Sequence, residues 1–171
     1  MADKRHGPGV ITLLVYLVST ASLSGGLSGW LYATGALDWA STLSAPNWAP
    51  SFGLLNLIGL FIPAFAVIAL WILQRSGKDG MRLACSLLIA LLLAGMATQI
   101  CIFFGMRDPA LGFLAAMAMW VYTLFAAGIV GRASSAAGVL LWIPFAWVTA
   151  MLVLGFEFMR LNAAGTFAGG I

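Results

Sequence analysis

Residues 83–104 read LACSLLIALLLAGMATQICIFF, and this uncharged run lies between Arg82 and Arg107. A helix needs about 20 apolar residues to cross the ~30 Å hydrocarbon core of a bilayer. A charge at the bilayer centre costs at least about 2.5–3.5 kcal/mol, so a long run without one is typical of a spanning helix. The run does not alternate between apolar and polar residues, as a membrane-spanning strand must. It therefore predicts a transmembrane helix.

The same pattern recurs on both sides of this run. We predict five spans, over residues 10–32, 52–74, 83–104, 110–131 and 138–161. Of the 171 residues, 63% are hydrophobic and 8% are charged, whereas soluble domains have about 45–50% and roughly 25%. This composition excludes a soluble globular enzyme, because so much apolar surface cannot be hidden from water. The sequence thus predicts an all-α, polytopic membrane protein, a five-transmembrane-helix bundle in a single integral membrane domain over residues 1–171.

The basic residues indicate the orientation of the bundle. With five spans, the N-terminus and the connections near 74–82 and 131–138 lie on one side, and six of the eight Lys and Arg residues fall there: Lys4, Arg5, Arg75, Lys78, Arg82 and Arg132. The positive-inside rule then places the N-terminus in the cytoplasm. The basic residues form no stripe, so we expect no nucleic-acid partner. The first apolar run could pass for a signal peptide, but it continues through Tyr32 and can span, so we expect it to be retained.

The connection between the first two spans, residues 35–51, differs from the others. It contains two tryptophans, Trp39 and Trp48, and two prolines four residues apart, Pro46 and Pro50. Prolines at this spacing disfavour a regular helix and stiffen the chain. We predict an ordered interfacial loop, and loops of this length without secondary structure are usually functional or disordered. The tryptophans favour the functional interpretation.

A few polar and reactive residues remain inside or beside the spans. Asn56 and Gln99 either form hydrogen bonds between helices or line an internal pocket. Cys85 and Cys101 fall in one predicted helix about 24 Å apart, so they cannot pair, and with the single His6 they assemble no metal or Cys/His catalytic site. Glu157 and Arg160, three residues apart near the end of the last span, either anchor the helix at the interface or offer a handle to a polar ligand group.

Four short motifs, in order along the chain, point to a known family. They are PNWAP at 46–50, FFG at 103–105, PFAW at 144–147 and GFEFMRLN at 155–162. In these motifs the chain resembles the tryptophan-rich sensory protein family, also called the translocator protein or peripheral benzodiazepine receptor family, in its bacterial form. The similarity covers roughly residues 39–162.

The resemblance implies a five-helix bundle, usually a homodimer, in a bacterial membrane. It also implies a pocket beneath the first loop that takes tetrapyrroles such as protoporphyrin IX and haem, or sterol-like ligands, with no required cofactor and no enzymatic turnover. Carried onto this chain, the loop residues lie over the pocket, Trp147 forms an aromatic wall and Phe103 lies at the far end. Together with the amides and the phenylalanine of PFAW, the expected ligand-binding residues are Trp39, Pro46, Trp48, Pro50, Asn56, Gln99, Phe103, Phe145 and Trp147.

Some positions depart from the family pattern and bear on function. The family's tryptophan in the second span falls near Gly59, and its Trp-Tyr pair in the loop reads Trp39-Ala40. These departures argue against family chemistry that needs two facing tryptophans, such as light-dependent porphyrin breakdown. We therefore expect a membrane receptor or carrier that regulates the transport or metabolism of its ligand. The alternatives are a structural or accessory subunit with a vestigial pocket and a light-dependent porphyrin-degrading enzyme.

Overall fold

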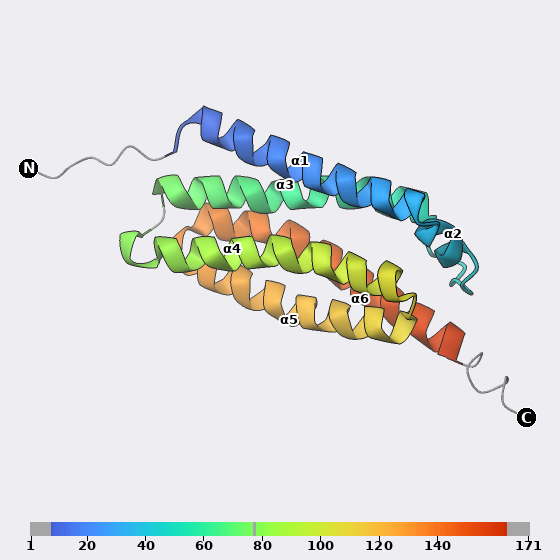
Figure 1. Ribbon diagram of the computed structural model, residues 1–171. Helices are drawn as coiled ribbons and strands as arrows, with labels where there is room; N and C mark the ends of the chain where they lie inside the picture. Colours follow the sequence, from blue (N-terminus) through green and yellow to red (C-terminus); the bar gives the residue numbers. More distant parts are fainter. Residues whose placement is uncertain (1–7, 77, 164–171) are drawn as a thin grey trace, which may run out of the picture.

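The computed structural model describes residues 8–76 and 78–163, and every regular element in these ranges is a helix. Five long helices are each long and apolar enough to cross a membrane: α1 (Val10–Ala33), α3 (Phe52–Ser76), α4 (Asp79–Ile100), α5 (Pro109–Ala133) and α6 (Ser135–Asn162). They run side by side as one elongated bundle (Figure 1). The expected all-α bundle of five spans is confirmed. The N-terminal Lys4 and Arg5, used above for orientation, lie outside the described residues.

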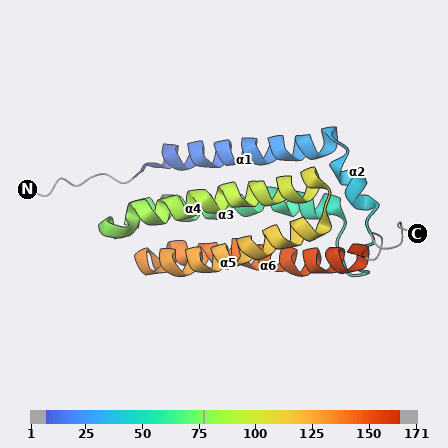
Figure 2. The ribbon, with the colours of Figure 1, turned by 60° about the horizontal axis from the view of Figure 1, so that its bottom comes forward.

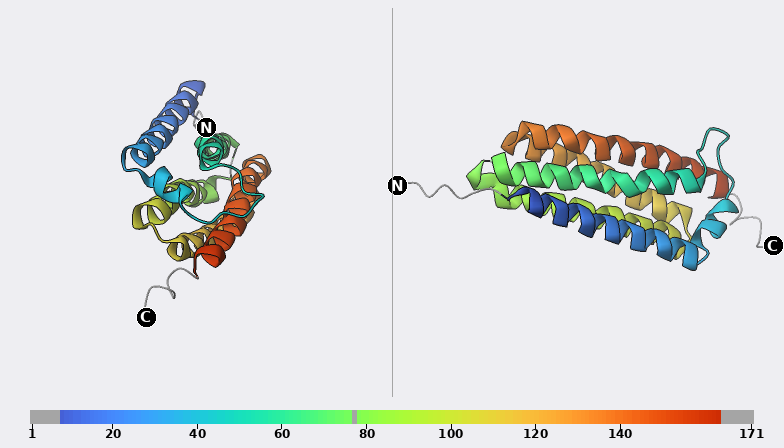
Figure 3. Two further views of the ribbon diagram at one scale, coloured as in Figure 1. Left: turned by 90° about the vertical axis from the view of Figure 1, so that its right-hand side faces the viewer. Right: turned by 90° about the horizontal axis from the view of Figure 1, so that it is seen from above.

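Helix α3 lies at the centre of the packing. It packs against α1, α4 and α6, while α4 packs against α5 and α5 against α6. Each long helix therefore neighbours the one that follows it, as short connections require. Helix α1 makes its extensive contacts with α3 and the short helix that follows it, not with α4. It stands at the side of the bundle in the end view (Figure 3, left), and Leu31 is its single buried residue.

Helices α5 and α6 form a tight hairpin joined by Ser134 alone. The expected connection over 131–138 is wrong, because both helices continue to this serine. Ser134 supports the junction by accepting a hydrogen bond at Oγ from the backbone N–H of Ala137, 3.5 Å away. Beyond it the backbones touch, and a Cβ added to Gly138 would lie 2.5 Å from Cα of Gly131. Small residues allow such close approach between membrane helices.

The structure also corrects the start of the third span and the form of the first connection. Helix α4 begins at Asp79 rather than Leu83, because its first polar turn stays helical. Within 35–51, residues Ala36–Ser41 form helix α2, which crosses the end of the bundle (Figure 2). Gly35 turns the chain into α2 with φ +64°, a left-handed conformation that glycine adopts without strain. The prolines follow α2, so the irregular part of the connection is confined to residues 42–51.

The end of α4 widens into a π-helix, η1 (Cys101–Gly105). A turn follows, and Asp108 caps α5 by accepting hydrogen bonds from the N–H groups of Ala110 and Leu111, at 2.8 and 3.2 Å. A π-helical turn in an α-helix is rare and frequently lies at a functional site. Here it presents Phe103 and Phe104 toward α2 and the interior of the bundle.

Candidate ligand-binding site

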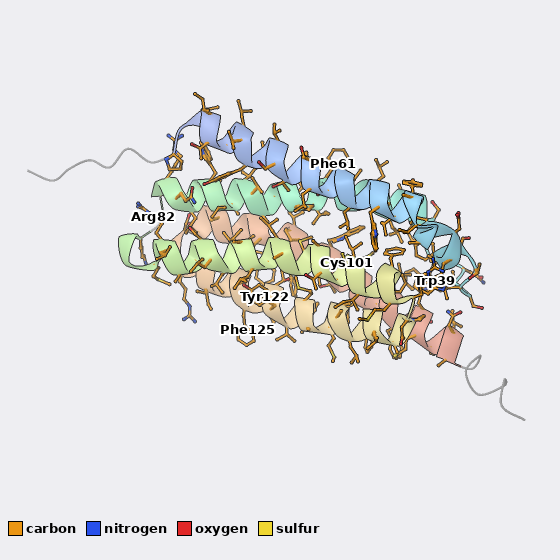
Figure 4. All side chains as sticks on the ribbon, viewed as in Figure 1. Trp39, Phe61, Arg82, Cys101, Tyr122 and Phe125 are labelled. Carbon is orange, nitrogen blue, oxygen red and sulfur yellow. The ribbon has the colours of Figure 1, made fainter. Side chains whose placement is uncertain are left out.

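The half of the bundle next to α2 contains a partly open cavity of about 320 Å³. All five long helices contribute to its wall. Its volume falls within the ~300–1,000 Å³ typical of small-molecule sites. Figure 4 shows the side chains in the view of Figure 1, with Trp39 at the α2 end of the bundle and Arg82 at the opposite end. The cavity therefore lies beneath α2, where the sequence predicted a pocket.

A cluster of aromatic rings closes the end of the cavity under α2. Phe52 stacks on Phe158 with ring centres 5.3 Å apart, and Phe103 meets Phe104 edge to face at 4.8 Å. All four rings line the cavity. Trp39 of α2 packs on the outer side of Phe103, with centroids 5.6 Å apart. Offset and edge-to-face pairs of this kind stabilise a packed aromatic cluster beyond the area that they bury.

Trp147 of α6 forms an aromatic part of the side wall. It lines the cavity beside Gly59 of α3, where an added Cβ would lie in van der Waals contact with the indole, 3.7 Å from Cζ2. A large residue at position 59 would therefore press on Trp147 or fill the space beside it. Gly59 and Trp147 are therefore neighbours on the cavity wall, where α3 and α6 pack against each other.

The polar groups on the wall are amides and hydroxyls. Ser28 of α1 donates a hydrogen bond from Oγ to Oδ1 of Asn56 on α3, 2.8 Å away. Asn56 thus fulfils both of its predicted roles, joining two helices and lining the cavity. The side chain of Gln99 lines the cavity and makes no hydrogen bond to a described residue. The predicted alternative, a side-chain hydrogen bond between helices, therefore fails for Gln99. Ser24 adds a hydroxyl from α1.

Most of the chain, including the residues around the cavity, matches one protein family. The model of the TspO/MBR family matches residues 13–161. The chain belongs to the TspO/MBR family. The match covers α3, α4 and α5 completely, nearly all of α1 and α6, the Trp/Pro connection and every residue named above on the cavity wall. It confirms the resemblance seen in the four motifs. A search of curated proteins finds no match. The family and the five apolar helices make this an integral, multi-pass membrane protein.

In this TspO/MBR protein the cavity wall includes four of the predicted site residues: Asn56, Gln99, Phe103 and Trp147. Trp39 reaches it only through Phe103. Phe145 does not line it, and packs instead against Trp120 and Trp142, with centroids 5.6 and 5.1 Å apart. Residues two apart on a helix point about 200° from each other, so Phe145 and Trp147 cannot share a face.

The loop prolines and Trp48 also lie off the cavity wall, so their contact with a ligand stays a prediction. Trp48 is 59% exposed, and Pro46 and Pro50 sit beside it in the irregular segment. What sequence reasoning missed is the set of wall residues from α1. Their spacing could have revealed them, because hydroxyls recur about one turn apart along one side of this helix: Thr20, Ser24 and Ser28.

Hydrogen bonds between distant parts of this TspO/MBR protein hold the connection between α1 and α3 across the end of the bundle. The backbone N–H of Ser44 donates to Oδ1 of Asn162, and Nδ2 of Asn162 donates to the Ser44 carbonyl, both at 3.0 Å. Arg107 donates from Nη2 to the carbonyl of Thr34, 3.2 Å away. The paired amide contact joins residues far apart in the sequence, at the end of α6 and just after α2.

Replacing Asn162 with Ala should therefore loosen the segment 42–51. The variant loses both hydrogen bonds to Ser44, each worth about 0.5–1.5 kcal/mol net, so backbone amides there should exchange about tenfold faster. Hydrogen–deuterium exchange read by mass spectrometry measures this. Glu157→Gln is the control, because it breaks only the exposed ion pair to Arg160, 2.6 Å long, on the same helix. Equal exchange in Asn162→Ala and the unaltered protein would contradict the prediction.

Proposed function

We propose that this protein is a membrane receptor or carrier for a flat hydrophobic ligand, tetrapyrrole-like or sterol-like, and that it regulates the transport or metabolism of that ligand without chemical turnover. The observation that carries the proposal is the cavity walled by all five long helices, with the Trp147 indole on its side wall. A rigid indole on the cavity wall offers a planar ligand an apolar surface to pack against. The four clustered phenylalanines extend that apolar surface to the end beneath α2.

The wall chemistry supports binding as the activity. Its side chains are aliphatic, aromatic, amide or hydroxyl, so they supply apolar area and a few hydrogen bonds that orient a ligand. This combination is typical of small-molecule sites. The glycine at position 59 leaves Trp147 without a facing tryptophan, which favours a binding role over a photochemical one.

The proposal includes a homodimer in a bacterial membrane with its N-terminus in the cytoplasm. A face of small residues on α4, made by Ala90, Ala94 and Thr98, is exposed and free for a second copy to pack against. At the basic end, the Arg75 guanidinium lies 4.7 Å from the ring centre of Trp71, a pairing suited to the membrane interface. The positive-inside rule makes this end cytoplasmic and α2 external.

A ligand titration with a blocked cavity tests the proposal. Purified protein in neutral detergent is titrated with protoporphyrin IX dimethyl ester, read by its Soret band, and with dehydroergosterol, read by energy transfer from tryptophan. Ala97 lines the cavity on α4, so Ala97→Trp should abolish saturable binding. Leu91→Trp is the control, because Leu91 lies on the same helix but is 59% exposed on its outer face. Failure of both probes to bind the unaltered protein, or equal binding by Ala97→Trp, would overturn the proposal.

A further inference from the structure

We infer that ligands reach the cavity sideways from the bilayer, through a portal between α1 and α4 that is bounded by Ser19 and Leu23 of α1 and Ala97 of α4. The inference rests on the proposed function, because it takes the cavity as the binding site, and it adds the route by which a hydrophobic ligand enters and leaves. Three features of the described residues carry it: the unpacked seam between the two helices, the exposed residues on the cavity wall and the closed end beneath α2.

The long helices form a ring around the cavity, and packing closes the seams between them except one. Helix α1 packs against α3, α3 against α6, α6 against α5 and α5 against α4. Helices α4 and α1 would complete the ring, but in the described chain this pair has no extensive contact. The hydrogen bonds that tie α1 side chains to another long helix, from Tyr16 to Gln74 and from Ser28 to Asn56, both reach α3. Helix α1 is thus held on its α3 side and open on its α4 side.

The cavity wall is exposed at this seam. Among the described wall residues, Ser19 and Leu23 are the two that are exposed, and both lie on α1. Leu23 is 63% exposed, and a Cβ added to Gly26, three residues later, would meet no atom within 4 Å. A side chain that lines a cavity and is exposed as well lies at the opening. Ser19 and Leu23 lie on either side of the midpoint of α1, so the cavity opens at the depth of the hydrocarbon core.

Trp30 shows that this side of α1 faces α4. It follows Leu23 by seven residues and Ser19 by eleven, so all three side chains lie on one stripe of the helix. The Trp30 indole lies against Gly105 in η1, the continuation of α4, where an added Cβ would be 3.5 Å from Cη2. This contact closes the seam near α2. The seam stays open about two to three turns away along α1, at Leu23 and Ser19.

The opposite edge of the portal, on α4, is made of small residues. Ala97 lines the cavity, and Cys101, one turn later, is exposed. Gly95 faces α5, since a Cβ added there would meet the Met119 side chain of that helix. Ala97 follows Gly95 by two residues and lies about 200° round the helix, so it points away from α5. Small residues on this edge leave room for a ligand to pass.

The end of the cavity beneath α2 is closed to a ligand that comes from water. The four clustered phenylalanines fill it, Trp39 covers Phe103 from outside, and Asn162 holds Ser44 across it. A ligand on this route would have to displace these contacts. A flat hydrophobic ligand is also more stable in the bilayer than in water, since transfer of apolar surface out of water is favourable. It therefore reaches the portal from within the hydrocarbon, apolar edge first.

Variants at the portal test the inference by their effect on rates. Protein in neutral detergent, which replaces the bilayer around the spans, is mixed in stopped flow with protoporphyrin IX dimethyl ester or dehydroergosterol for association, and with excess empty micelles for dissociation. Ser19→Trp should slow both rates by about tenfold, because an indole at the portal narrows the route in both directions. Leu23→Ala should widen the portal and speed association about threefold. Ser22→Trp is the control: it places the same side chain on an exposed part of α1 off the cavity wall, so both rates should stay within about twofold.

The outcomes separate this inference from the proposed function. Unchanged rates in Ser19→Trp, or faster dissociation, which marks a lost wall contact, overturn the portal and leave the ligand-binding function standing. If Ser19→Trp does not bind, Leu23→Ala decides, and an unchanged association rate in it overturns the portal. Asn162→Ala should leave both rates unchanged, and faster association in this variant would place the entry beneath residues 42–51 instead. No saturable binding of either probe by the unaltered protein overturns the proposed function and the inference together.

Discussion

Replacing Trp147 with Ala should weaken porphyrin binding by about 30-fold or more. Truncation of a large aromatic side chain at the centre of a binding site typically costs at least 2 kcal/mol. Here the indole lines the cavity beside Gly59, which has no side chain that could replace the lost apolar surface. A Soret titration with protoporphyrin IX dimethyl ester gives the two dissociation constants directly.

Trp48→Ala is the matched control for this experiment. It removes the same side chain from a position that is 59% exposed and off the cavity wall, so the affinity should stay within about twofold. The pair also separates the loop from the wall as the source of aromatic contact. Loss of affinity in Trp48→Ala with none in Trp147→Ala would place the ligand beneath the loop instead of inside the bundle.

Gly138→Ala should destabilise the α5–α6 hairpin. The new Cβ would lie 2.5 Å from Cα and 2.9 Å from N of Gly131, both backbone atoms that cannot rotate away. The helices must separate to admit it, and overpacking of this kind costs about 1–3 kcal/mol. In a chain of this size each kcal/mol lowers the melting temperature by roughly 2–4 °C. A thermal melt in detergent, followed by tryptophan fluorescence, measures the shift.

Gly131→Ala tests the same contact from the other helix. A Cβ at this position would lie 3.9 Å from Cα of Gly138, which is ordinary van der Waals contact. Alanine also favours a helix over glycine by about 0.5–1 kcal/mol. The melting temperature should therefore stay the same or rise. Equal losses in Gly131→Ala and Gly138→Ala would show that the hairpin does not pack through Gly138 as described.

The five helices were predictable because each is encoded locally. An uncharged run such as 83–104 must satisfy its backbone within one segment in lipid, so length and charge spacing decide the element. The connections are encoded less directly. Residues 131–138 contain Arg132 and two serines, which suggested a loop, but these polar groups are tolerated at the end of a helix near the membrane surface. Helix α2 was not predicted because Pro46 and Pro50 disfavour a helix, although they affect only the residues after Ser41.

The site was predictable only where a residue had to face the interior. Asn56 and Gln99 are amides within apolar spans, and the cost of exposing them to lipid turns them inward. Phe145 lies off the cavity wall although Trp147 of the same motif lines it, because a sequence motif does not state which of its members share a helical face. Which wall a loop covers depends on contacts between distant segments, such as Ser44 with Asn162, and no local pattern contains them.

The sparse packing of α1 links its position to ligand binding. Its extensive long-helix contacts are with α3, and yet it supplies one side of the cavity. A ligand that touches α1 on one side and α4 or α6 on the other adds contacts that the helix otherwise lacks. Binding and the docking of α1 are then thermodynamically linked, and the apparent affinity equals the intrinsic one multiplied by the fraction of molecules with α1 docked. In the proposed receptor, ligand binding would therefore raise the fraction of molecules in which α1 is docked against α3.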